Sequence, residues 1–213
     1  MLFELTNDEG KFLIILGRSA VETFLKTGHI VKLPKDMPQK FYRKCGVFIT
    51  IKMLVNGEKV LRGCIGYPYP THFLAEAVIN SAINAATEDP RFPAMTFDEL
   101  SKCVFEVSVL TPPELIQVDN PKEYKHRIKI GQDGLIVEKG CSKGLLLPQI
   151  PVELQWNEEE SLCQCCMKAG LPPDSWLTRD IKIHRFTAII FVEQTPSGES
   201  KRLNMTDKQV ISK

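Results

Sequence analysis

An arginine and a cysteine two positions apart carry the chemistry that this sequence signals most clearly. Arg62 and Cys64 lie in a short stretch of strand-forming residues, and successive side chains of a strand point to opposite faces. We expect the apolar Leu61 and Ile65 to face the core. The Arg62 guanidinium then lies beside the Cys64 thiol on the other face. Because a neighbouring positive charge lowers the pKa of a thiol and favours the thiolate, the pair predicts a reactive cysteine or an anion-binding pocket.

Two glycines flank this cysteine. Gly63 and Gly66 leave backbone N–H groups open to close approach by a ligand. A helix is expected a few residues later, and its positive N-terminal dipole adds to the charge of Arg62 if it turns back toward the strand. The alternative is structural: Cys64 is then a small buried hydrophobic residue and Arg62 a surface charge. The spacing matches neither the nucleophile elbow nor a phosphate-binding loop, so both interpretations stay open.

A histidine and a glutamate at the start of that helix are further candidates. His72 and Glu76 are four residues apart, so they share one helix face. A histidine near Cys64 would supply the base that a cysteine nucleophile needs. The alternative is that His72 is a surface residue of the first helical turn.

A second cysteine cluster, Cys163, Cys165 and Cys166, contains a C-x-x-C spacing. Structural zinc usually takes four ligands from two such pairs, and the other candidates here, Cys141 and His184, are far away in the sequence. The same positions fit the buried stripe of an amphipathic helix. We therefore expect core packing, with no metal and no cofactor.

The charge balance argues against a nucleic-acid-binding protein. The 213 residues include 27 Lys and Arg against 26 Asp and Glu, a net charge of +1, and non-specific nucleic-acid binding requires a strongly basic field. One basic cluster, at Lys122, Lys125, Arg127 and Lys129, alternates in part with isoleucines. This cluster is typical of a solvated strand face, so nucleic-acid contact is not expected.

The cysteine count and the apolar runs indicate in which cellular compartment the protein is expected. Seven cysteines is an odd number and a small share of the chain, which favours a reducing environment. The acidic N-terminus lacks the basic and apolar regions of a signal peptide. No apolar run approaches the roughly 20 residues of a membrane helix. We expect a cytoplasmic protein without a membrane span.

The first half of the chain predicts a helix, a hairpin and a second helix. Thr6 and Glu9 have the spacing of a capping box, and Asn-Gly at residues 56–57 tolerates the positive φ angles of a tight turn. The expected elements are a helix from residue 7 to Gly28, strands at 47–51 and 60–65, and a helix capped by Thr71 and ended near Glu88.

The second half predicts strands around one helix. The expected elements are a half-buried strand at 102–111 ended by two prolines, a meander of strands at 127–130, 135–138 and 145–147, a helix capped by Asn157 and ended at Gly170, and a final strand at 184–193. Helices and strands mix without regular βαβ alternation. This pattern favours an α+β fold with a mainly antiparallel sheet flanked by helices.

Three motifs together resemble the AMMECR family: Leu61-Arg62-Gly63-Cys64-Ile65-Gly66, Asp89-Pro90-Arg91-Phe92-Pro93 and Leu147-Pro148-Gln149. The similarity to archaeal members extends through residues 107–115 and 134–140. The resemblance implies an α+β fold with a larger and a smaller lobe and a cleft between them. We expect one domain at residues 1–197, with a smaller lobe around 112–155 and a polar C-terminal tail at 198–213. The resemblance implies no reaction, because no biochemical activity is established for the family.

The resemblance makes Asp89 and Arg91 companions of Cys64, because their segment ends the helix that follows the first motif. An aspartate there can accept or orient a proton, and Arg91 can bind a carboxylate or phosphate. The alternative is a turn fixed by an ion pair between the two.

Two functions follow. The first is an enzyme, or the partner of one, whose cleft binds a small anionic or modified substrate. Its catalytic candidates are Cys64 and Asp89, and its binding candidates are Arg62, Gly63, Gly66, Arg91, His72 and Glu76. The second is a non-catalytic adaptor that presents the first motif to a protein or RNA. Prokaryotic relatives occur beside a Memo-like protein and a radical-SAM protein, so the resemblance implies these as partners in a pathway.

Overall fold

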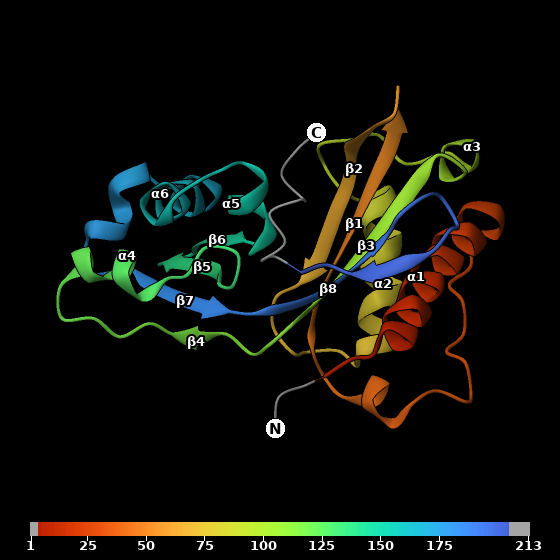
Figure 1. Cartoon of the computed structure of the whole chain (residues 1–213), viewed down its shortest axis with the longest axis horizontal. Helices are drawn as coiled ribbons and strands as arrows, with labels where there is room; N and C mark the ends of the chain where they lie inside the picture. Colours follow the sequence, from red (N-terminus) through yellow and green to blue (C-terminus); the bar gives the residue numbers. More distant parts are fainter. Residues whose placement is uncertain (1–3, 205–213) are drawn as a thin grey trace. The chain divides into compact units, whose positions relative to one another are not determined.

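The computed structural model describes residues 4–204, which form two compact units (Figure 1). Unit 1 contains the chain up to Leu110 together with Ile189–Leu203. Unit 2 contains Thr111–Ala188. Each unit has its own sheet and its own hydrophobic core. The expected α+β class, with antiparallel pairing, is confirmed.

Unit 1 is a five-stranded sheet in the order β2-β1-β3-β8-β9, with two long helices packed on it. The strands are β1 (Gly46–Val55), β2 (Glu58–Tyr67), β3 (Cys103–Leu110), β8 (Ala188–Glu193) and β9 (Ser200–Arg202); the helices are α1 (Asn7–Thr27), α2 (Leu74–Thr87), the short α3 (Phe97–Leu100) and the 3-10 turn η1 (Gln39–Tyr42). Figure 1 shows α1 and α2 side by side against the strands. Their apolar faces and one face of the sheet form the core.

Local signals explain where these elements begin and end. Thr6 and Glu9 form the reciprocal capping box of α1, and Gly28 ends it with a φ of 71°. Asn56 and Gly57, with φ of 52° and 87°, make the tight turn between β1 and β2. The predicted cap at Thr71 is wrong, because α2 starts three residues later with Phe73 at its N-cap. Its end at Thr87 agrees with the prediction.

The central strand β3 is more buried than the sequence suggested. All eight of its residues are buried, so the expected half-buried strand is wrong. It lies in the middle of the sheet, with β1 on one side and β8 on the other. At the sheet's edge, β9 pairs with β8 through residues inside the expected C-terminal tail; the remainder of that tail, 205–213, lies outside the described residues.

Unit 2 is a four-stranded antiparallel sheet in the order β4-β7-β5-β6 with α6 packed against it. Its elements are β4 (Glu114–Leu115), η2 (Pro121–Glu123), α4 (Tyr124–Arg127), β5 (Gly134–Lys139), β6 (Ser142–Leu146), α5 (Gln149–Glu153), α6 (Glu158–Lys168), η3 (Pro173–Leu177) and β7 (Lys182–Phe186). The capping box of Asn157 and Glu160 starts α6 as predicted.

Two predictions for unit 2 are wrong. The expected strand at 127–130 is the end of α4 and the loop after it, so the basic cluster lies on η2, α4 and this loop. The expected strand at 184–193 is two strands, because the ladder breaks at Thr187. The first part, β7, belongs to the sheet of unit 2, and the second, β8, belongs to that of unit 1.

Candidate functional site

The hexapeptide, residues 61–66, lies on β2, and an irregularity in that strand decides which way its side chains point. Ile65 pairs with Ile49 and Cys64 with Thr50, but Leu61 pairs with Lys52 across a register shift. Arg62 is the extra residue of this β-bulge. Leu61 and Ile65 therefore lie on opposite faces, and the prediction that they share one is wrong. Strict alternation fails wherever a bulge inserts a residue.

Arg62 is committed to a partner inside unit 1. Its Nε and Nη2 donate to the two carboxylate oxygens of Glu99 at 2.8 and 3.2 Å, and Nη2 also donates to the carbonyl of Pro93 at 3.0 Å. Only 6% of Arg62 is exposed. The bond from Arg62 lowers the pKa of Glu99 to about 2, so the pair is ionised at neutral pH. This geometry fastens β2 to α3 and leaves Arg62 poorly placed to clamp a soluble anion.

Cys64 is half-buried and is held through both its side chain and its backbone. The Thr50 hydroxyl donates to Sγ at 3.1 Å. The Cys64 N–H donates to Oδ2 of Asp89 at 2.8 Å. The structure therefore brings Cys64 and Asp89 together, although 25 residues separate them in the sequence.

Asp89 links this backbone amide to Arg91. Its Oδ1 accepts the Arg91 backbone N–H at 3.1 Å and Nε at 2.9 Å, and its Oδ2 accepts Nη2 at 2.6 Å. The bond from Arg91 is the main cause that lowers the pKa of Asp89 to about 2. A buried carboxylate with four donors is a poor proton acceptor and a good anchor. The ion-paired turn that the sequence left open as an alternative is present.

Arg91 itself is accessible. Its side chain is 54% exposed, and its pKa is raised, chiefly by the bond to Asp89 and to a smaller degree by a coulombic interaction with Cys64. The positive charge of Arg91 therefore acts on the sulfur. Among the predicted binding residues, Arg91 is the one that is both linked to Cys64, through Asp89, and open to solvent.

The two glycines allow close packing of neighbouring backbone. A Cβ at Gly63 would overlap the backbone carbonyl of Ala85, so α2 rests directly on this strand. A Cβ at Gly66 would overlap the carbonyl of Val47 and the ring of Phe48 on β1. Neither position is open space.

His72 and Glu76 have other surroundings. The His72 ring lies 4.3 Å from that of Tyr67, between centroids, and its Nδ1 is 2.8 Å from the Thr71 hydroxyl. The Glu76 carboxylate lies in the first turn of α2 and makes no hydrogen bond or ion pair with any residue in 4–204. No contact among these residues makes His72 or Glu76 the base for Cys64.

The structure adds residues that the sequence analysis missed. Thr50 on β1 pairs with Cys64 on one side and with Glu106 of β3 on the other, and directly paired residues share a face. Cys64, Thr50 and Glu106 thus form a polar row across three strands. Lys52, two residues along β1, places Nζ 3.6 Å from Oε2 of Glu106. The sequence did contain a signal for this polar row, because Glu106 is a single charged residue inside the mostly apolar stretch 103–110.

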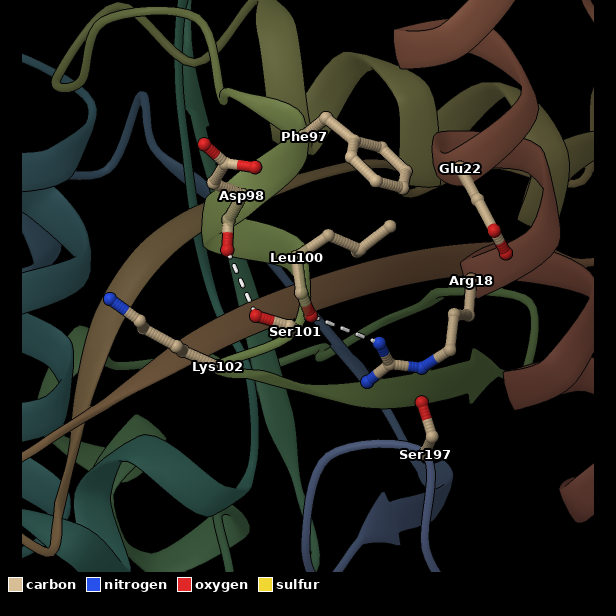
Figure 2. A pocket seen from close by; sticks show the side chains of 8 residues that line it. All are labelled: Arg18, Glu22, Phe97, Asp98, Leu100, Ser101, Lys102 and Ser197. Carbon is tan, nitrogen blue, oxygen red and sulfur yellow. Dashed lines mark hydrogen bonds between the residues drawn. The ribbon is translucent and has the colours of Figure 1, made fainter.

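A hollow elsewhere in unit 1 has different chemistry. It measures about 470 Å³ and is lined by Arg18, Glu22, Phe97, Asp98, Leu100, Ser101, Lys102 and Ser197 (Figure 2). The Arg18 guanidinium donates to the Leu100 carbonyl and forms an ion pair with Glu193, and Glu22 pairs with Lys26. These charges are satisfied within the protein, and the lining contains no thiol.

The cysteines of α6 belong to the core of unit 2. Cys165 and Cys166 are fully buried, and burial raises their pKa to about 12 and about 11. Cys163 is half-buried against the same core. Within residues 4–204, no three His, Cys, Asp or Glu side chains are grouped so that they can hold a metal ion. None of the helices described is long and apolar enough to cross a membrane.

The fold and the site define an α+β protein of two units, the first of which carries a half-buried cysteine in a polar row of its sheet. A family model, AMMECR1, matches residues 14–191. The chain belongs to the AMMECR1 family.

Relatives cover nearly the whole chain. Protein PH0010 of Pyrococcus horikoshii is 52% identical over 203 residues, which are 95% of this chain and 98% of the relative. Protein MJ0810 of Methanocaldococcus jannaschii is 51% identical, over 92% of this chain and 95% of the relative. The crystal structure of the uncharacterised protein PH0010 is similar with a TM-score of 0.91 and 51% identity, covering 94% of this chain and 99% of that one.

Proposed function

We propose that the protein is an enzyme whose nucleophile is the Cys64 thiolate. The observation that carries this proposal is the hydrogen bond from the Thr50 hydroxyl to Sγ, at 3.1 Å, on a cysteine that is only half-buried. A hydroxyl that donates to sulfur stabilises the thiolate form, and so does a nearby guanidinium. Arg91 supplies that second charge.

The other site residues have positioning and binding roles in this proposal. Asp89 fixes the Cys64 backbone and the Arg91 side chain at once. Arg91 keeps Nη1 outside its ion pair with Asp89, and its side chain is more than half exposed. The substrate class is therefore a small molecule that carries an electrophilic atom for Cys64 and an acidic group for Arg91.

The test is the alkylation rate of Cys64, followed by peptide mass spectrometry after iodoacetamide labelling. The exposed Cys141 is the internal reference within the same chain. We expect Cys64 to react at least tenfold faster than Cys141 at pH 7, despite its greater burial, because only the thiolate is nucleophilic. A Cys64 that reacts more slowly than Cys141 would remove the nucleophile from the proposal.

The same geometry disfavours an adaptor that presents the hexapeptide to a partner. Arg62 is buried in its ion pair, and Gly63 and Gly66 pack on backbone. The one charged side chain of the motif is therefore not available to a partner. An adaptor predicts that a Cys64→Ser protein keeps its full cellular function; the enzyme predicts that it loses it.

A further inference from the structure

Lysines gather on the face of the unit 1 sheet that carries Cys64. Ile49 and Ile51 of β1 belong to the core that α1 and α2 share with the sheet. Lys52 alternates with these isoleucines along β1, so its side chain points to the opposite face, which we call the second face. Thr50 and its partner Cys64 lie on the second face as well.

Two further lysines belong to the second face. Lys59 of β2 pairs with Leu54, which follows Lys52 by two residues on β1 and shares its face. Lys201 of β9 pairs with Val192 of β8. The neighbour of Val192 on the strand is a core residue, so Val192 and Lys201 point away from the core. Three strands thus each place a lysine on this face.

The side chain of Lys59 lies across the sheet. Its Nζ donates to the backbone carbonyl of Glu193 on β8 at 3.4 Å, although β1 and β3 lie between β2 and β8. Burial lowers the pKa of Lys59, and so does repulsion from Lys52 and Lys201; the charges of Glu106 and Glu193 raise it to a smaller degree. The three ammonium groups are therefore close enough to repel one another.

The carboxylates of unit 1 balance only part of this positive charge. Lys52 has Glu106, with Nζ 3.6 Å from Oε2. The carboxylate of Glu193 is bound by an arginine of α1. Lys59 and Lys201 are exposed, and neither forms an ion pair with a carboxylate in residues 4–204. Two accessible positive charges are left, which suits a ligand that carries two negative charges.

We infer that Lys59 and Lys201, beside Lys52, bind a phosphate group of the substrate, an inference that rests on the proposed nucleophile. A phosphate monoester carries about two negative charges at neutral pH, and lysine binds phosphate as a point charge. Lys52 is two residues from Thr50, the strand partner of Cys64, which is a separation of roughly 7 Å along the strand. One small phosphorylated substrate therefore spans the lysines and the sulfur.

The first experiment is calorimetric titration of the whole protein with inorganic phosphate. The variants are Lys59→Gln/Lys201→Gln and the charge-preserving Lys59→Arg/Lys201→Arg. The control, Lys11→Gln/Lys32→Gln, removes the same charge from α1 and the loop after it. We expect roughly fivefold weaker binding by the first variant, because exposed charges contribute modestly, and unchanged binding by the other two. No binding by wild type, or equal binding by the first variant, overturns the inference.

The second experiment connects the lysines to Cys64. Iodoacetate is an anion and iodoacetamide is neutral, so the ratio of their alkylation rates reports the positive charge around a thiol. We expect a higher ratio at Cys64 than at Cys141, and a roughly threefold fall in Lys59→Gln/Lys201→Gln or in saturating phosphate. A ratio that neither changes overturns the inference.

Two further outcomes separate the inference from its alternatives. Phosphate binding that is lost in Arg91→Gln but kept in Lys59→Gln/Lys201→Gln would place the anion at Arg91 and overturn the lysine site. A Cys64 that reacts slowly with iodoacetamide overturns the proposed nucleophile. The titration with phosphate does not depend on Cys64, so the two failures are distinguishable.

Discussion

Asp89 shows how one side chain connects two parts of a site. Its oxygens accept the Cys64 N–H on β2 and three N–H groups of Arg91. The bonded amide belongs to an edge strand, where unpaired N–H groups would otherwise attract foreign strands. Asp89 thus orients the backbone at Cys64 and closes that edge locally.

Asp89→Asn is expected to lower the free energy of unfolding by about 1–3 kcal/mol at pH 7, because it weakens charged hydrogen bonds to a buried group. The pKa of Asp89 is about 2 in the folded protein against an ordinary 3.8. A depressed pKa adds stability that is present above pH 3.8 and lost as the pH falls toward 2.

Urea unfolding at a series of pH values measures this. The difference between wild type and Asp89→Asn should shrink between pH 4 and pH 2, while the exposed Asp36→Asn shows no such trend. A constant difference would mean that Asp89 carries no special charge stabilisation.

The pair of Arg62 and Glu99 predicts an asymmetry between its two members. Arg62 is 7% exposed at the side chain and Glu99 28%. Glu99→Gln leaves the buried Arg62 guanidinium without its charged partner. It should lower the free energy of unfolding by about 2 kcal/mol, which is below the range for fully buried pairs. Arg62→Met leaves a carboxylate that water can reach, so it should cost less. Thermal unfolding of both variants checks the order, and a larger loss for Arg62→Met would contradict it.

At the scale of elements, a glycine sets the distance between α2 and the strand that carries Cys64. Gly63→Ala places a methyl group into the backbone carbonyl of Ala85, which cannot move without the helix. We expect a loss of about 3 kcal/mol, at the upper end of overpacking effects, together with slower alkylation of Cys64.

Gly17 of α1 is the matched control for this substitution. A Cβ there would lie 3.5 Å from the side chains of Ala82 and Val78, an ordinary contact. Because alanine favours a helix over glycine by about 0.5–1 kcal/mol, Gly17→Ala should leave the protein as stable or more stable. Denaturant midpoints for the two variants should therefore move in opposite directions; a shared destabilisation would refute the difference in packing.

The elements that the sequence predicted well carry their signals locally. The capping box of α1, the Asn-Gly turn and the cap of α6 each depend on residues within a few positions. The missed features depend on pairing between distant segments. The bulge at Arg62 is set against β1, and the row through Glu106 needs the register of three strands. The bond from Cys64 to Asp89 spans 25 residues, which only the resemblance to a family had suggested.

At the scale of the whole molecule, unit 2 is an insertion between two neighbouring strands. Its chain leaves after β3 and returns before β8, and these strands are adjacent in the sheet. Thr111 donates its N–H to the Thr187 carbonyl at 2.9 Å, and the Thr187 N–H donates to the Thr111 hydroxyl at 2.9 Å. The end of β3 therefore lies beside the start of β8, as at the closed end of a hairpin.

This closure predicts that unit 1 folds without the insertion. Replacing residues 112–186 by Asn-Gly should join β3 to β8 through a two-residue turn, which antiparallel neighbours favour, and the core of unit 1 contains no residue from the deleted range. We expect cooperative thermal unfolding and retained protection of the β3 amides from hydrogen exchange. A shortened protein that lacks both would show that the sheet of unit 1 needs unit 2 to form. In a folded one, the alkylation rate of Cys64 then measures how much of the site's chemistry resides in unit 1, since Thr50, Asp89, Arg91 and Glu106 all remain.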